Sequence, residues 1–330
     1  MLKSTYGQSI WIIDHFKLRP IDGCYTEVKM KMFSTTQTIC LISCCILLIG
    51  CKSYQYLGQQ PPTDVPKIFA PQIVSLADRK EEVITFSPDL KEIYYSIEFY
   101  PEPKPSFIMY MKYENGQWSD PDTVDFSIGR RTSEPFMGLG GTRLYYFASA
   151  VNNQKGILDI CYSDRTEKGW SDPISLSSPP NFLNPKFTLH PCILSDTSIY
   201  FSSYSGEICK SRYKNGSYEE IEILPSPINH MNLKNAECWG DPFVSQDEEF
   251  MIFRSNREGG YGGSDLYIVF KIEEGSWSEP QNLGPKINSI HDELGGDITP
   301  DGKFMTFGRE GDLYWVSTSF IKELRGNVMR

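Results

Sequence analysis

The tetrapeptide Trp118-Ser-Asp-Pro121 recurs twice further along the chain, as Trp170-Ser-Asp-Pro173 and as Trp277-Ser-Glu-Pro280. A weaker copy, Tyr218-Glu-Glu-Ile221, lies between the last two. From aromatic to aromatic, the intervals are 52, 48 and 59 residues. Self-similarity at a period of about 20 to 50 residues is the signature of a repeat architecture. The chain is therefore expected to consist of one repeated structural unit.

Each copy follows a glycine-containing turn, for example Asn115-Gly116 and Asn215-Gly216. Asn-Gly between apolar runs is a strong signal for a β-hairpin. Upstream of each copy lies a second turn followed by an aromatic-rich strand. Its five occurrences are Ser87–Tyr95, Gly140–Phe147, Ser195–Phe201, Ser245–Phe253 and Thr299–Phe307.

A further apolar strand follows in every unit, and a short strand precedes every upstream turn, so each unit holds four strands. Four-stranded sheets at this period are typical of β-propeller blades. The last unit lacks its outer strand, whereas Pro71-Gln-Ile-Val-Ser-Leu76, before the first unit, echoes Pro280-Gln-Asn-Leu283. We therefore expect an all-β propeller of five four-stranded blades, or six if one unit is degenerate, whose last blade is closed by this N-terminal strand.

The turns Ser87-Pro-Asp89 and Thr299-Pro-Asp-Gly-Lys303, and above all the stretch Ser255–Tyr267, resemble the WD40-like repeats of TolB-type envelope propellers. The resemblance covers residues 71 to 318, while the turns at Gly140 and Ser195 depart from the pattern. It implies the propeller fold and a bacterial envelope lipoprotein. It does not imply a particular activity, because the family includes binding platforms as well as uncharacterised lipoproteins.

Residues 38–50 form an uncharged and mostly apolar run behind Lys29 and Lys31, which is the pattern of a signal peptide. The run ends in Leu48-Ile49-Gly50-Cys51, which resembles the lipobox of bacterial lipoproteins and implies lipidation of Cys51. We therefore expect upstream residues and a signal peptide at 1–50, a lipidated cysteine and tether at 51–66, the propeller at 67–320 and a tail at 321–330. The protein would be lipid-anchored to a membrane of the bacterial cell envelope, on its periplasmic or surface face.

The composition argues against two classes of ligand, nucleic acids and metal ions. The net charge of −10 argues against nucleic acid, because phosphate binding needs a surplus of Lys and Arg. The later cysteines, Cys161, Cys192, Cys209 and Cys238, form no C-x-x-C pair, so no zinc cluster is expected. No metal and no other cofactor is predicted.

Titratable residues recur at one position of the innermost strand. Aligning the strands on a shared proline gives Glu134-Pro135, His190-Pro191 and Asp241-Pro242, with Gly295 and Val83 at the same position in the remaining blades. Asp297, two residues after Gly295, points to the same face of its strand. We therefore expect Glu134, His190, Asp241 and Asp297 to converge on the mouth of the central channel.

Two residues of neighbouring loops complete the candidate ligand-binding set. Trp239 is the kind of aromatic that packs against sugars when it lies beside carboxylates, or is a core residue between blades. Arg257 begins the glycine-rich stretch 257–263, which precedes a strand and is therefore interpreted as a hairpin loop without phosphate-binding function.

The sequence contains no complete catalytic motif, and G-x-S-x-G in particular is absent. The favoured function is therefore a non-enzymatic binding scaffold for an envelope protein or for a polysaccharide such as a peptidoglycan component. The alternative is a glycan-active hydrolase using Glu134, Asp241 and Asp297, since such enzymes act through paired carboxyl groups.

Overall fold

A computed structural model describes residues 54–99, 106–149, 158–176, 189–203, 205–229, 240–273 and 276–328. The chain divides into two units, Met1–Ser53 and Tyr54–Arg330, and only the second contains described residues. The predicted signal peptide and Cys51 lie outside them. Within the described ranges, no helix is both long enough and apolar enough to cross a membrane.

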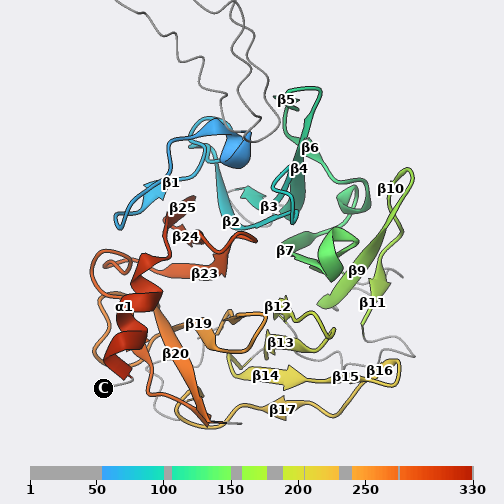
Figure 1. Cartoon of the computed structure of the whole chain (residues 1–330). Helices are drawn as coiled ribbons and strands as arrows, with labels where there is room; N and C mark the ends of the chain where they lie inside the picture. The colour runs from blue at the N-terminus through green and yellow to red at the C-terminus, as the bar shows by residue number, and fades with distance from the viewer. Residues whose placement is uncertain are drawn as a thin grey trace, which may run out of the picture. The chain divides into compact units, whose positions relative to one another are not determined.

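Unit Tyr54–Arg330 is a five-bladed β-propeller, which confirms the predicted fold class (Figure 1). Each blade is an antiparallel sheet whose first strand lies at the channel and whose last strand lies outermost. Blade 1 contains β2 (Arg79–Phe86), β3 (Glu92–Phe99), β4 (Ser106–Glu114) and β5 (Gln117–Trp118), with β6 (Asp122–Thr123) also on β4. Blade 2 contains β7 (Thr132–Gly138), β8 (Arg143–Ser149), β9 (Leu158–Thr166) and β10 (Gly169–Trp170), with β11 (Ile174–Ser175) also on β9.

Blades 3, 4 and 5 repeat the arrangement. Blade 3 contains β12 (Leu189–Ile193), β13 (Ile199–Ser202), β14 (Ile208–Ser211) and β17 (Glu222–Ile223), followed along the rim by the hairpin of β15 (Tyr213–Lys214) and β16 (Ser217–Tyr218). Blade 4 contains β18 (Phe243–Val244), β19 (Phe250–Ser255), β20 (Asp265–Glu273) and β21 (Ser276–Trp277), with β22 (Gln281–Asn282) also on β20. Blade 5 contains β23 (Glu293–Ile298), β24 (Phe304–Arg309), β25 (Asp312–Ser317) and, from the N-terminal side, β1 (Lys67–Ile68).

An N-terminal strand closes the last blade, as expected, but it is not the predicted one. Lys67 pairs with Trp315 and Ile68 with Tyr314, whereas residues 71–76 form a tight turn. The amides of Ile73 and Val74 both donate to the carbonyl of Ala70, at 3.1 and 2.9 Å. The prediction that Pro71–Leu76 forms the closing strand was therefore wrong. Burial of Phe69 places the strand at Lys67–Ile68, directly before it in the sequence.

The core consists of five hydrophobic clusters, and each lies between two neighbouring blades. Aromatic residues of the second strands, such as Tyr94, Tyr146 and Phe201, are at most 2% exposed. This accounts for the aromatic-rich strand that recurs in the sequence. The second strand of a blade is buried on both faces, because a neighbouring blade packs on each side of it. Burial of apolar surface between blades, rather than within one sheet, stabilises the ring.

A hydroxyl caps the turn between first and second strands in three blades. The Ser87 hydroxyl donates to Asp89 at 2.7 Å and accepts the amide of Glu92 at 2.9 Å. Ser245 and Thr299 make the same two contacts. Each hydroxyl donates to the aspartate two residues later and accepts the backbone amide five residues later. The recurring Ser/Thr-x-Asp motif is thus a turn-stabilising device.

Residues 54–66, expected to form a tether, contact the propeller. Tyr56, in the 3₁₀ helix η1 (Gln55–Gly58), is 4% exposed and packs on Phe86, Phe304 and Trp315. Its hydroxyl donates to Asp301 Oδ1 at 2.6 Å. Tyr56 also has a positive φ of 52°, a strained conformation that persists because these contacts stabilise it. Two further 3₁₀ turns are η2 (Asp125–Ser127) and η3 (Leu139–Gly141).

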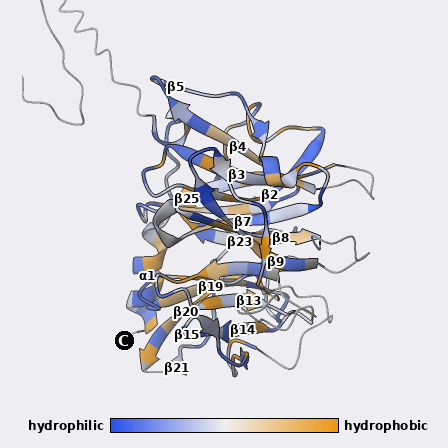
Figure 2. Cartoon of the chain, turned by 90° about the vertical axis from the view of Figure 1, so that its right-hand side faces the viewer, coloured by the Kyte–Doolittle hydropathy of each residue, from blue (hydrophilic) through white to orange (hydrophobic). Residues whose placement is uncertain are grey.

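The C-terminal residues 321–330, expected to be a tail, belong largely to helix α1 (Ser319–Val328). Phe320, Ile321 and Leu324 pack on the cluster between blades 4 and 5. Figure 2 shows both hydrophobic and hydrophilic colours along α1, as expected for a helix that covers a core with one face. The helix therefore covers one blade interface from outside.

Replacing Tyr56 with alanine is expected to lower the free energy of unfolding by about 3 kcal/mol, because a large buried aromatic and its contacts with blades 1 and 5 are lost. Tyr261→Ala is the control, since Tyr261 is 49% exposed and should change stability by about 0.5 kcal/mol or less. Urea unfolding of both variants measures the difference. Equal effects of the two substitutions would contradict the docking of η1.

Candidate ligand-binding site

A distortion of the inner strands turns polar side chains into the channel. In blades 2, 3 and 5 the pairing register breaks around Glu134, His190 and Gly295. Glu134, His190 and Asp241 all have positive φ, at 56°, 51° and 43°. Such values are uncommon for residues other than glycine and recur at functional sites. A β-bulge therefore re-aims the same position in several blades.

His190 lies between two carboxylates that come from the neighbouring blades on either side. Its Nε2 is 3.1 Å from Glu134 Oε1 and 2.9 Å from Asp241 Oδ1. Its backbone amide also donates to Glu134 Oε2 at 2.8 Å. Burial alone would lower the pKa of His190, but these two carboxylates raise it to about 9. The imidazole is therefore a cation at neutral pH.

Asp241 is the most constrained acid of the group. It is 3% exposed, and Arg254 Nε of the second strand in the same blade lies 2.7 Å from its Oδ2. Burial would raise the pKa of Asp241, but Arg254 and His190 together lower it. For Glu134, burial prevails over the attraction of His190, and the pKa of that carboxyl is raised. Asp241 is thus the firmly ionised member.

Asp297 has a different environment. Burial raises its pKa to about 7, the charge of Asp241 adds to the effect, and His190 opposes it. Within the described ranges, the Asp297 carboxylate makes no hydrogen bond or ion pair. It therefore carries a proton in a large fraction of molecules at neutral pH and faces the channel unpaired.

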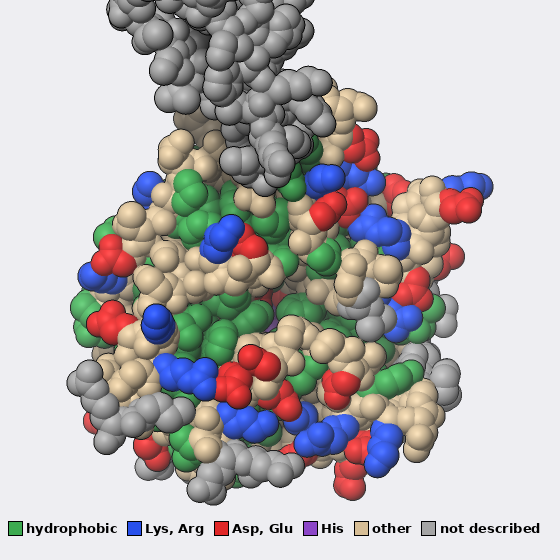
Figure 3. All heavy atoms as spheres, viewed as in Figure 1, with side chains coloured by type: hydrophobic (Ala, Val, Ile, Leu, Met, Phe, Trp, Pro, Cys, Tyr) green, Lys and Arg blue, Asp and Glu red, His purple; other side chains and the backbone are tan. Residues whose placement is uncertain are grey.

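These residues border two connected spaces. A small cavity of about 20 Å³ is lined by Glu134, His190, Asp241 and Asp297 and has room for a water molecule. A larger space of about 780 Å³, here called the funnel, is lined by the turns between first and second strands of all five blades. Phe136 and Asp297 line both spaces. Figure 3 shows hydrophobic side chains around a hollow at the centre of the viewed face.

The structure thus brings together the four side chains that the aligned prolines selected, and it adds two more. Arg254 joins through Asp241. Glu82 precedes Val83, which lines the small cavity. Burial raises the pKa of Glu82 to about 7, with further contributions from Glu98 and Glu134. The sequence alignment placed Val83 at the shared position of the inner strand, which was wrong by one residue. The two-residue bulge of blade 1 is Glu82-Val83, so Glu82 corresponds to Glu134, and no proline marks the bulge in this blade.

Of the two loop residues of the predicted set, only Arg257 lies among the described residues, and it does not join this cluster. Arg257 lies between blades 3 and 4, donates to the Ile228 carbonyl at 3.0 Å and stacks over Phe253 and Tyr267. Its placement is that of a residue that supports a loop. Trp239 lies outside the described residues.

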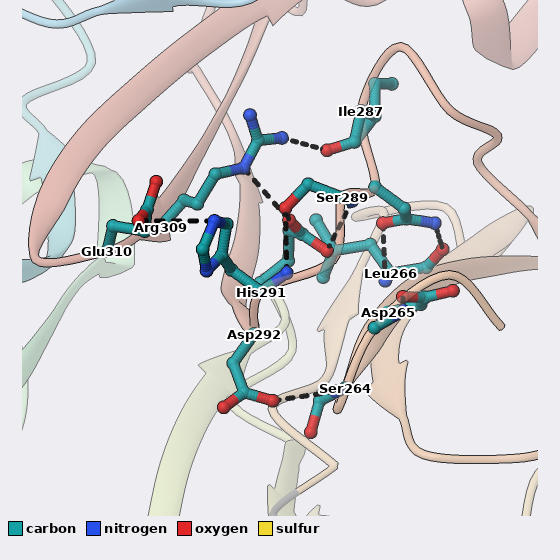
Figure 4. A network of polar contacts seen from close by, with 12 residues as sticks. Ser264, Asp265, Leu266, Ile287, Ser289, His291, Asp292, Arg309 and Glu310 are labelled. Atoms are coloured by element: carbon teal, nitrogen blue, oxygen red, sulfur yellow. Dashed lines mark hydrogen bonds and ion pairs between the residues drawn. The ribbon is translucent and has the colours of Figure 1, made fainter.

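The glycine-rich stretch is the hairpin loop between β19 and β20. The Asp265 carboxylate accepts the amides of Tyr261 and Gly262 at 2.6 and 3.0 Å, so it holds the loop from inside. Figure 4 shows the adjoining network, in which Asp292 accepts the amide of Ser264 and His291 contacts Glu310. These polar groups are paired with one another, which indicates a structural role.

Among the described residues, no group of three or more His, Cys, Asp or Glu side chains is arranged to hold a metal ion. The cysteines Cys161, Cys192 and Cys209 are free and buried.

No family model and no curated protein matches the chain. Among solved structures, it is similar to the catalytic domain of the GH62 α-L-arabinofuranosidase of Coprinopsis cinerea, with 10% identity over 78% of this chain and 97% of that chain, and a TM-score of 0.49. A gluconolactonase from Xanthomonas campestris gives 10% identity, 77% and 96% coverage and a TM-score of 0.41. The Dos1 propeller gives 9% identity, 72% and 55% coverage and a TM-score of 0.38. Identities this low carry no activity over to this chain.

Asp297→Asn is expected to stabilise the protein at pH 8 by on the order of 1–2 kcal/mol, and to have less effect at pH 5. The sign follows from the raised pKa: the folded state holds the proton more tightly, so stability is lost as pH rises from about 4 to about 7. The substitution removes this loss of stability at high pH, because an asparagine side chain does not ionise.

Asp241→Asn is the matched control with the opposite sign. It leaves His190 and Arg254 without their shared carboxylate and should lower stability by about 3 kcal/mol. Urea unfolding at both pH values measures the two variants. A destabilised Asp297→Asn variant at pH 8 would contradict the assigned burial of an unpaired carboxyl.

Proposed function

We propose that the chain is a ligand-binding propeller whose ligand occupies the funnel and contacts Asp297 at its floor. The observation that carries the proposal is the unpaired, half-buried carboxyl of Asp297, which lies at the junction of the small cavity and the funnel. Spaces of about 300 to 1,000 Å³ with apolar walls and few polar groups are typical of ligand sites. An unpaired buried polar group costs free energy unless a ligand satisfies it.

The surroundings specify the chemistry of the ligand. Phe136, Phe243 and Ile298 line the funnel and favour an apolar body. Asp297 favours a group that donates a hydrogen bond, because its buried carboxyl makes no hydrogen bond or ion pair within the described residues. The expected ligand is therefore a molecule with an apolar portion and one donor group, or a protein side chain of that kind.

The proposed setting is the bacterial cell envelope. The apolar run 38–50 and the Gly50-Cys51 junction support export and lipid attachment at Cys51, and the repeat resembles TolB-type propellers. In this setting the propeller acts as a binding scaffold for an envelope protein or an envelope polymer such as a peptidoglycan component.

A capture experiment tests the site. The full chain is incubated with envelope extract as wild type, as Ser195→Trp and as Ser205→Trp. Ser195 is exposed at the funnel, whereas Ser205 is exposed in a turn at the other end of the same blade. The wild type and Ser205→Trp should retain a ligand that Ser195→Trp loses at least tenfold. Equal capture by all three, or capture by none, would overturn the funnel as the binding site.

A second candidate is glycan hydrolysis, favoured by one observation. Asp241 and Asp297 line one cavity with pKa values shifted in opposite directions, as a base and an acid require. Against it, the Asp241 carboxylate is engaged by His190 and Arg254, and the cavity has no room for a sugar ring.

Hydrolysis predicts release of reducing ends from envelope polysaccharide by wild type, and a loss of about a hundredfold or more in Asp297→Asn. Folding of the variant is checked by its unfolding transition. Equal rates in the two proteins would exclude Asp297 as the acid, and capture without any release would favour the scaffold.

A further inference from the structure

We propose that the funnel opens on the membrane-facing side of the anchored protein, so that the partner of this face is the surface of a lipid bilayer. The inference rests on the proposed attachment at Cys51 and adds to it an orientation, which follows from where the chain enters the propeller.

The two faces of the propeller carry different connections. The funnel face contains the turns between first and second strands, including Pro88, Ser195 and Gly302, and the turns between third and fourth strands. The opposite face contains the connections between second and third strands, such as the loop between β19 and β20. Because successive strands are antiparallel, this assignment holds in every blade.

The chain enters the described structure on the funnel face. The Tyr54 hydroxyl donates to the Asp89 carbonyl at 3.3 Å, and the Tyr56 hydroxyl donates to Asp301 at 2.6 Å. Asp89 and Asp301 belong to the turns between first and second strands of blades 1 and 5. Tyr54 also stacks on Tyr113, with ring centroids 4.9 Å apart, and its carbonyl accepts the Trp118 indole N–H at 2.8 Å.

These contacts make Tyr54–Gly58 a fixed point rather than the end of a free tether. Tyr56 and Leu57 both have positive φ, so the segment is held in a conformation that an unpacked chain would leave. The contacts of this segment with blades 1 and 5 therefore determine at which face of the propeller the upstream chain is attached.

Chain length supplies the remaining constraint. Cys51 precedes Tyr54 by three residues, which span at most about 11 Å when fully extended. An inner strand such as β2 has 8 residues and is about 26 Å long, which sets the distance between the two faces. A lipid on Cys51 can thus reach a bilayer beside the funnel face, while the opposite face remains a full blade height away.

The orientation is tested on the lipidated mature chain, residues 51–330, in vesicles of phosphatidylethanolamine and phosphatidylglycerol that carry a headgroup nitroxide. A fluorophore is attached to Lys303→Cys, in a turn of the funnel face, or to the control Glu258→Cys, in the loop between β19 and β20. Lys303 is 62% exposed in its side chain, and Glu258 is also exposed. Cys161, Cys192 and Cys209 are buried, so a polar maleimide selects the introduced thiol in a Cys238→Ser background.

We expect the nitroxide to quench the fluorophore at position 303 at least threefold more than the one at position 258. Stronger quenching at position 258, equal quenching at both, or a chain whose mass shows no lipid on Cys51 would each overturn the proposal. Capture by the funnel is measured separately with the Ser195→Trp and Ser205→Trp pair. Loss of the orientation with capture retained would therefore refute this inference alone.

Discussion

Closure of the ring by a two-residue strand is the constraint on which the rest of the molecule depends. Lys67 and Ile68 complete blade 5, and the next residue, Phe69, is fully buried against Trp315 of blade 5 and Phe86 of blade 1. The amide of Phe69 also donates to the Leu313 carbonyl at 2.7 Å. Without β1, blade 5 would expose the edge of β25, and an open ring would expose one apolar face of blade 1 and one of blade 5. Closure buries these two faces and fixes the spacing of all five inner strands.

The charged cluster exists only because the ring is closed. Glu134, His190, Asp241 and Asp297 belong to four different blades, and the ion pairs of His190 bridge blades 2, 3 and 4. Burying these charges costs free energy, and the attraction among them offsets that cost only while their geometry is held. His190 and Arg254 together balance Asp241 and Glu134, whereas Asp297 makes no ion pair in the described structure. Such an imbalance is typical of a site in which function, rather than stability, determines the residue.

The sequence alone was sufficient for the architecture and for most of the cluster, and the reasons lie in the repeat. Each blade contributes the same strand position, so aligning Pro135, Pro191 and Pro242 compares residues that lie at one level of the channel. The method fails where a blade departs from the pattern. Glu82 was missed because no proline marks the bulge of blade 1, so the alignment selected Val83, one residue too late. Arg254 was not placed in the cluster because its contact with Asp241 depends on packing across two strands, which no spacing encodes.

Two further predictions were wrong for separate reasons. The closing strand was assigned to residues 71–76 because of a Pro-Gln echo, whereas burial of Phe69 selects Lys67–Ile68. Arg257 was grouped with the channel as a residue of a neighbouring loop, but its guanidinium pairs with carbonyls of the loop before blade 4.

The two ends of the channel differ in a way that bears on how a ligand would use it. The funnel offers about 780 Å³, but the space among Glu134, His190 and Asp241 has room only for a water molecule. Because His190 is held by carboxylates from both sides, widening this constriction would break two ion pairs at once. A ligand of the funnel would therefore meet a charged floor and leave by the mouth through which it entered. Asp297, which makes no hydrogen bond or ion pair in the described structure, is where its recognition would be decided.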